Sequence, residues 1–280
     1  MAGAAVFSVA PGTGPEASPL IVADQLTNTN SDTQFGRLGR AAIVCLVAAA
    51  VSLAGCGGSS KHRGRTATVT PSANVAPASA VVINIGATPI TGATYNHWMA
   101  VGAATVERPK PDGPLPRPTV YAPPDFTACV ARLREASSGS TVAELKAKCE
   151  RTYEAIQRRI LNFLITGYWL RGQAAEEHAL VTDAEVRRKF NEEKRANYPT
   201  AGSFRRLQEA SRQTVPDLEF AVETQMLSAK LLEEFIKTHS HDKSEQATIA
   251  AFNKWIRSTW APKTECQPGY VIADCARHKP

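Results

Sequence analysis

The chain has 280 residues, of which 43% are hydrophobic and 21% are charged, and its formal net charge is +6. This apolar content is enough to build a core, so the composition excludes an intrinsically disordered chain, and the length allows one or two domains. Lys and Arg are interleaved with Glu and form no long basic block, which argues against binding to nucleic acid.

Residues 1–55 have the layout of a secretory signal peptide with a long amino-terminal region. Arg37 and Arg40 precede an almost unbroken apolar run from Ala41 to Ala54. This run is too short for a membrane span, which needs about 20 residues. We therefore predict cleavage after residue 55, with an uncleaved membrane anchor as the alternative.

The apolar run ends in Leu53-Ala54-Gly55-Cys56, a pattern that closely resembles the bacterial lipobox. Small side chains at 54 and 55 let the backbone enter a peptidase site, and the thiolate of Cys56 is a nucleophile that can take up a diacylglyceryl group. Acyl chains on this cysteine would hold the protein on a membrane surface. The sequence thus predicts a lipoprotein whose mature chain begins at Cys56.

Four cysteines remain after Cys45 leaves with the signal peptide and Cys56 is lipidated: Cys129, Cys149, Cys266 and Cys275. An even number in an exported chain predicts two disulfides. Three pairings are possible, and the positions favour the two local ones, which join the first cysteine to the second and the third to the fourth. A zinc site is the alternative, although no Cys-x-x-Cys spacing occurs.

The segment after Cys56 changes from tether to folded chain near residue 80. Residues 56–80 are rich in Gly, Ser, Thr, Ala and Pro, which predicts a flexible tether. The β-branched run from Val81 to Ile85 ends at Gly86 and predicts a short strand. We expect one helical domain over 81–280.

A first helix is predicted over 92–104, with Thr91 as its cap. Its aromatic and sulfur-containing side chains follow one another at spacings of three and four: Tyr95, Trp98 and Met99. Seven prolines then fall between 108 and 124, which predicts an extended, polyproline-like connector.

Two capping boxes predict the starts of longer helices. Thr141-x-x-Glu144 heads a helix with a continuous apolar stripe, and Thr182-x-x-Glu185 begins a helix over 183–196. Further helices are predicted from Phe126 to Ala136, from Thr200 to Ala210, from Thr214 to Phe235 and from Ser244 to Trp260, and a strand is predicted from Tyr270 to Ala273.

Several of these segments resemble, in the right order, the SurA and PrsA family of cell-envelope foldases, which share a SurA N-terminal domain. The resemblance begins at Val82 to Thr91 and Tyr95 to Met99, which look like the family's opening strand, turn and helix. It continues through 161–177 and 181–186 and then from Phe204 to Leu227. The resemblance implies a mainly α chaperone module with a small β element.

Many members of that family carry a parvulin domain, the peptidyl-prolyl isomerase unit, before the closing helix. Here Phe235-Ile236-Lys237 leads directly to the last helix, without room for the roughly hundred residues of such a domain. The resemblance therefore implies a non-enzymatic, lipid-anchored chaperone outside the cytoplasm that binds unfolded exported polypeptides without a cofactor. A peptidyl-prolyl isomerase with a degenerate site is the alternative.

A chaperone of this kind needs accessible apolar and aromatic side chains that accept many sequences. The candidates for client contact are Tyr95, Trp98, Met99, Phe163, Tyr168, Trp169 and Met226. The competing interpretation is that these residues at helical spacing belong to the core.

Motifs for catalysis are scarce. His239-Ser240-His241-Asp242 has two imidazoles that could share a metal, but its position after a long helix fits a polar cap. His97 and His178 have no acid or cysteine partner that the sequence can assign. No Gly-rich phosphate loop and no Gly-x-Ser-x-Gly motif occurs. The sequence therefore predicts no catalytic residue and no metal site.

Overall fold

The structure is a computed structural model that describes residues 76–106, 115, 118–137, 139–239 and 244–276. Within these ranges it contains seven α-helices and one three-stranded sheet, which confirms a mainly α fold with a small β element. The predicted signal peptide, Cys45, Cys56 and most of the predicted tether lie outside the described residues. So do His241 and Asp242 of the histidine motif.

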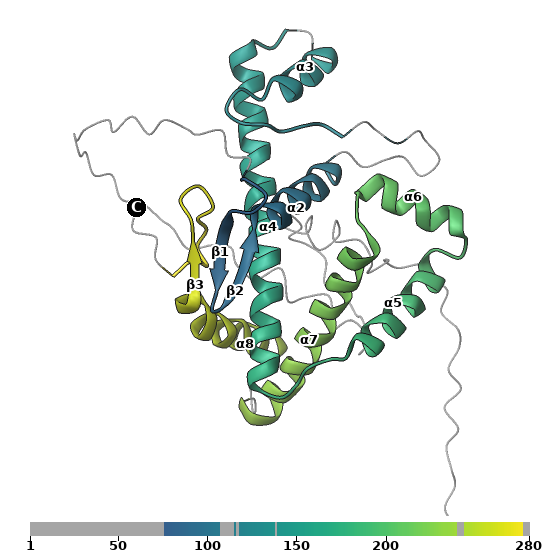
Figure 1. The fold of residues 1–280 in the computed structure, drawn as a ribbon, viewed down its shortest axis with the longest axis vertical. Helices are drawn as coiled ribbons and strands as arrows, with labels where there is room; N and C mark the ends of the chain where they lie inside the picture. Colours follow the sequence, from purple (N-terminus) through teal and green to yellow (C-terminus); the bar gives the residue numbers. More distant parts are fainter. Residues whose placement is uncertain (1–75, 107–114, 116–117, 138, 240–243, 277–280) are drawn as a thin grey trace, which may run out of the picture.

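Helix α4 (Val142–Glu176) is the axis of the fold, and other helices lie along its length (Figure 1). It begins at the predicted capping box: the Glu144 N–H donates to Thr141 Oγ1, and the Thr141 N–H donates to the Glu144 carboxylate at 2.8 Å. The helices that contact it are α2 (Gly92–Ala104), α3 (Thr127–Ala136), α7 (Val215–His239) and α8 (Glu245–Trp260).

The sheet has the order β2-β1-β3, and both pairings are antiparallel. The predicted strand β1 (Val81–Ile85) lies in the centre, between β2 (Thr88–Thr91) and β3 (Thr264–Cys266). The strand predicted at 270–273 is wrong, because no strand lies there. Tyr270 instead packs edge-on against Tyr95, with ring centroids 4.9 Å apart, so the apolar character of this segment serves the core and not the sheet.

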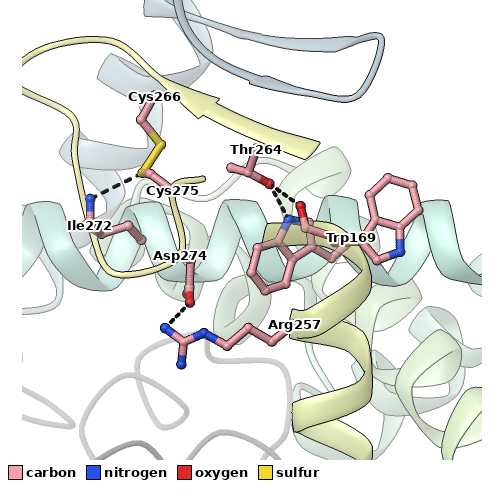
Figure 2. The surroundings of a disulfide bond; sticks show 8 residues. Trp169, Arg257, Thr264, Cys266, Ile272, Asp274 and Cys275 are labelled. Carbon is pink, nitrogen blue, oxygen red and sulfur yellow. Dashed lines mark hydrogen bonds and ion pairs between the residues drawn. A yellow bond between two sulfur atoms is a disulfide. The ribbon is translucent and has the colours of Figure 1, made fainter. Parts of the chain in front are cut away.

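The segment after β3 is a loop closed by a disulfide between Cys266 and Cys275 (Figure 2). Beside it, Asp274 forms an ion pair with Arg257 of α8 at 2.6 Å. The Ala276 N–H donates to the Thr264 carbonyl at 2.7 Å, so the chain after the loop returns to the outer edge of β3. The disulfide and these contacts fix the end of the described chain to α8 and the sheet.

Thr264 links this strand to two helices (Figure 2). The indole Nε1 of Trp169 in α4 donates to Thr264 Oγ1 at 2.8 Å, and Thr264 Oγ1 donates to the Trp260 carbonyl at 2.9 Å. Thr264 has no exposed surface, so both bonds replace water for a buried hydroxyl.

The second disulfide, Cys129–Cys149, joins α3 to the first part of α4. Both disulfides have the pairing that the sequence predicted, and they indicate an oxidising compartment outside the cytoplasm. Among the helices that the structure describes, none combines the length and the apolar content that crossing a membrane requires.

The described residues form three groups of buried apolar side chains, of which a minor one consists of Phe126 and the Cys129–Cys149 disulfide. The main core fills the space among the sheet, α2, α4, α7 and α8 and includes Ile83, Val101, Ile160, Leu231 and Phe252. A smaller core lies among α5 (Asp183–Asn197), α6 (Ala201–Ser211) and α7, and its buried side chains are Val186, Phe190, Phe204, Leu207, Leu218 and Val222. We call α5 and α6 together the arm, which extends to one side of α7 in Figure 1.

The predicted tether is too long at its end, because residues 76–80 belong to the fold. Ala76 is 4% exposed, and its carbonyl accepts a hydrogen bond from Asn96 Nδ2 of α2 at 2.8 Å. The Gly92 N–H donates to the Ala80 carbonyl at 2.7 Å. The small side chains and the proline of this segment gave no sign of these contacts, since they are made mostly by the backbone.

Candidate functional site

Four aromatic side chains from three helices meet where α2, α4 and α7 pack together: Trp98, Phe163, Tyr168 and Phe220. We call them the aromatic cluster. The ring centroids of Trp98 and Phe163 lie 4.8 Å apart, and those of Phe163 and Phe220 lie 5.4 Å apart at 88°. Tyr168 lies 5.9 Å from Phe220. These tilted and edge-on arrangements are the favoured geometries of aromatic pairs.

The close approach of α7 to α4 depends on Gly167, which lies next to Tyr168 in the chain. A Cβ at position 167 would lie 2.5 Å from Phe220 Cζ, closer than two carbon atoms can pack. Glycine therefore leaves room for the Phe220 ring against the backbone of α4. Any larger residue at 167 would push this ring out of the cluster.

The cluster is buried at one end and reaches the surface at the other. Trp98 is only 4% exposed, whereas Phe163, Tyr168 and Phe220 are half-buried. Met99, next to Trp98 on α2, is also half-buried and packs against the main core. The accessible parts of Phe163, Tyr168 and Phe220, which meet at the Phe220 ring, form an apolar surface on α4 and α7 above the buried Trp98. We call it the aromatic surface.

A charged pair borders this surface. The guanidinium of Arg171 lies 4.7 Å from the centroid of the Phe220 ring and 5.6 Å from that of Tyr168. Its Nε donates to Glu223 Oε1 at 2.8 Å, and its Nη2 donates to Glu223 Oε2. Cation–π contact and ion pair together hold a polar group at the edge of an aromatic surface.

A second polar contact joins α2 to the start of α7. His97 Nε2 lies 2.8 Å from Asp217 Oδ2, and the same oxygen accepts hydrogen bonds from the Thr214 N–H and hydroxyl, each at 2.7 Å. The sequence assigned no acid partner to His97, and the structure supplies one from 120 residues away. The contact fixes α2 against the helix that carries the arm, so it has a positioning role.

Three of the predicted client-contact residues are core residues, which corrects that prediction for them. Tyr95, Trp98 and Trp169 are 1%, 4% and 4% exposed. Burial, reinforced by the nearby Tyr153, raises the pKa of Tyr95 far above its ordinary value, and its hydroxyl accepts a hydrogen bond from Gln157 Nε2 at 2.8 Å. Helical spacing identified these side chains as apolar contacts but could not show that other elements cover them.

The other four candidates are partly accessible. Phe163 and Tyr168 belong to the aromatic surface, whereas Met99 packs against the main core and Met226 against the smaller core. The cluster also contains Phe220, which the sequence analysis missed. The apolar spacing of helix α7 predicts a stripe of Leu218, Val222, Met226 or Leu227, Leu231 and Phe235. Phe220 lies off this stripe, because α7 is apolar on two sides and packs against both the main core and the smaller core. The spacing of seven and four from Phe220 to Leu227 and Leu231 could have revealed this second side.

The described histidines do not form a metal site. Within the part of the chain that the structure describes, no group of three His, Cys, Asp or Glu side chains could hold a metal ion. His239 stacks on Phe235 with ring centroids 4.5 Å apart, and its Nδ1 lies 2.6 Å from Thr238 Oγ1. His178 and His239 both line a pocket of about 310 Å³ at the ends of α4 and α7. The absence of a metal or catalytic centre stays a prediction.

No family model matches the sequence, and searches of the curated proteins and of the solved structures returned no match. The function must therefore be argued from the residues and their arrangement.

Proposed function

We propose that this protein is a chaperone of the holdase type, which binds unfolded exported polypeptides outside the cytoplasm and is held at the membrane by a lipid on Cys56. The observation that carries the proposal is the half-buried aromatic surface formed by Phe163, Tyr168 and Phe220. The two disulfides support the compartment.

The chemistry of this surface suits a client that has no fixed structure. Aromatic side chains offer large apolar area without a directional requirement, so they contact many different apolar segments. The Arg171–Glu223 pair at the border supplies charges that can remain solvated while a client covers the rings.

A non-catalytic role fits the connection between the last two helices. Helix α7 ends at His239 and α8 begins at Glu245. This short connection leaves no room for the parvulin domain that many members of the SurA and PrsA family carry before the closing helix. The lipid anchor rests on the sequence pattern at Cys56 alone.

The test uses the chain from residue 56 onward, with Cys56→Ser to prevent acylation. A chemically denatured protein is diluted into buffer with or without this chain, and aggregation is followed by light scattering. We expect suppression at near-stoichiometric amounts. The double variant Phe163→Gln/Tyr168→Gln should lose most of it, because it places polar groups on the aromatic surface.

The control variant Val142→Gln/Leu180→Gln changes two apolar side chains that are 49% and 55% exposed and are not part of the aromatic surface. It should suppress aggregation like the parent, and circular dichroism should show that both variants are folded. A parent that does not suppress aggregation would contradict the proposal. Catalytic acceleration of a proline-limited refolding step by the parent would instead favour an isomerase.

A further inference from the structure

Four of the basic side chains of the arm lie along one side of α5. Between residues 183 and 212 the chain has eight Lys or Arg and five Asp or Glu, whereas α7, which packs against the arm, has five Asp or Glu and two Lys. The arm is therefore the basic part of a pair of neighbouring regions with opposite charge. A charge separation of this kind produces a field that can orient the molecule near a charged partner.

The spacing of residues along α5 shows where the charges lie. The helix faces the smaller core with Val186, Phe190 and Glu193. At 100° per residue, Arg187, Arg188 and Arg195 fall in one continuous sector away from this core, and Lys194 lies at the edge of the sector, where its ammonium contacts Phe204 of the core. We call this sector the basic face.

No acidic residue interrupts the basic face. The other side chains in this sector are Ala184 and Asn191, which are uncharged. Glu185 and Glu192 lie on one flank beyond it and Asp183 on the other, and the buried Glu193 pairs with Lys189 at 3.3 Å. Arg187, Arg188 and Arg195 are exposed, so their charges point into solvent.

The carboxyl end of this face is a concave corner. A pocket of about 460 Å³ lies between α5 and α6 and is lined by Lys194, Arg195, Tyr198, Pro199, Thr200 and Ala201. The Lys194 ammonium lies 4.2 Å from the centroid of the Phe204 ring, which holds its stem against the arm. The corner thus presents the cations of Lys194 and Arg195 beside the ring of Tyr198. This combination suits the polar interface of a lipid surface.

We propose that the basic face of α5 docks on an anionic lipid surface through lipid phosphate groups. The inference rests on the membrane location in the proposed function, but not on its client site. Ala76, the first described residue, follows Cys56 by twenty positions in the chain. Twenty residues span at most about 70 Å, so a lipid on Cys56 would keep Ala76 within this distance of the membrane. At such an effective concentration a weak electrostatic contact becomes populated.

The aromatic surface and the basic face belong to different helices. The former is built from α4 and α7, and the latter from the side of α5 that faces away from the smaller core. A contact between α5 and the membrane would therefore leave the aromatic surface available to a client. An acidic polypeptide is the other partner that a basic face could take, and the experiment separates the two.

The experiment measures co-sedimentation of the chain from residue 56 onward, carrying Cys56→Ser, with vesicles of phosphatidylcholine and phosphatidylglycerol in equal parts. We expect binding to these vesicles, weakening as salt is added, and no binding to pure phosphatidylcholine. A basic side chain near such a surface strengthens binding about fivefold, so the variant Arg187→Gln/Arg188→Gln/Lys194→Gln/Arg195→Gln should bind at least tenfold more weakly.

A matched control removes the same number of positive charges elsewhere. Lys148, Arg151 and Arg158 on α4 and Lys254 on α8 are exposed, and their replacement by Gln gives the same net charge. This control should bind the vesicles within about twofold of the parent, since only distant charges are lost.

Three results would overturn the proposal. One is a parent that does not bind the anionic vesicles, and another is an equal loss of binding in both quadruple variants. The third is a basic-face variant that keeps vesicle binding but no longer suppresses aggregation in vesicle-free solution, because the face would then serve acidic clients. The vesicle-free assay also distinguishes this failure from failure of the proposed function, since the parent is tested there without lipid.

Discussion

The sheet and the helices around the main core, which we call the body, bury many more apolar side chains than the arm does. The main core receives side chains from the sheet and four helices, and the disulfide after β3 closes the chain over it. The smaller core has six buried apolar side chains from α5, α6 and one side of α7. Because local stability follows the apolar area that an element buries, the arm is the part of the fold that should open first.

The largest effect on stability is expected from a cavity in the main core. Phe252 on α8 is 1% exposed, and its ring lies 5.7 Å from that of Phe235. The change Phe252→Ala should lower the free energy of unfolding by about 3–5 kcal/mol. Chemical denaturation followed by circular dichroism measures this loss, and a change below about 1 kcal/mol would show that α8 contributes little to the body.

The next effect concerns the disulfide that closes the body. The double change Cys266→Ser/Cys275→Ser should cost about 2–3 kcal/mol, because it releases a loop with a sequence separation of 9 in the unfolded chain. Hydrogen exchange should speed up in β1 and β3 and stay unchanged in α5. Equal acceleration in α5 would mean that body and arm unfold together.

A matched pair of valines compares the two regions directly. Val101 in the main core has no exposed surface, and Val186 in the arm is 6% exposed. Each change to Ala removes the same atoms and should cost about 1–2 kcal/mol. We expect Val101→Ala to lower the midpoint of global unfolding, and Val186→Ala to speed amide exchange mainly in α5 and α6. Equal shifts of the global midpoint in both variants would contradict a difference in local stability between the main core and the arm.

The smallest effect is a pH effect at the start of α5. Hydrogen bonds from the backbone and the hydroxyl of Thr182 lower the pKa of Glu185, and Thr141 does the same for Glu144 at the start of α4. Because the pKa of each Glu is lowered in the folded state, each cap contributes its full stabilisation at pH values above the ordinary pKa of Glu. This contribution is lost as the pH falls through the folded-state pKa. Thr182→Ala should move the pKa of Glu185 upward in an NMR titration and leave Glu144 unchanged.

Features that depend on local chemistry could be predicted from the sequence. Capping boxes at Thr141 and Thr182 fixed the starts of two helices, because the donor and acceptor lie only three residues apart. The two disulfides could be paired because each joins cysteines close in the chain. A third capping box, Thr200 with Ser203, was missed because Ser stands where Glu or Gln is usual.

Features that depend on distant partners could not be predicted. The residues of β3, Thr264 to Cys266, carry no strand pattern of their own, and only pairing with β1 makes them a strand. The contact between His97 and Asp217 likewise joins residues far apart in the chain. For the candidate site, the apolar stripes identified which side chains pack, but not that the sheet and the end of the chain cover Tyr95 and Trp169 while Phe163 and Tyr168 reach solvent.

The two edges of the small sheet offer little to a passing strand. At one edge, Pro89 of β2 has no N–H to donate, and at the other, β3 is only three residues long and its Thr264 carbonyl already accepts from Ala276. Short or proline-containing edges discourage the addition of foreign strands. A protein that spends its time among unfolded chains would thereby avoid becoming a seed for the fibrous aggregates that it is proposed to prevent.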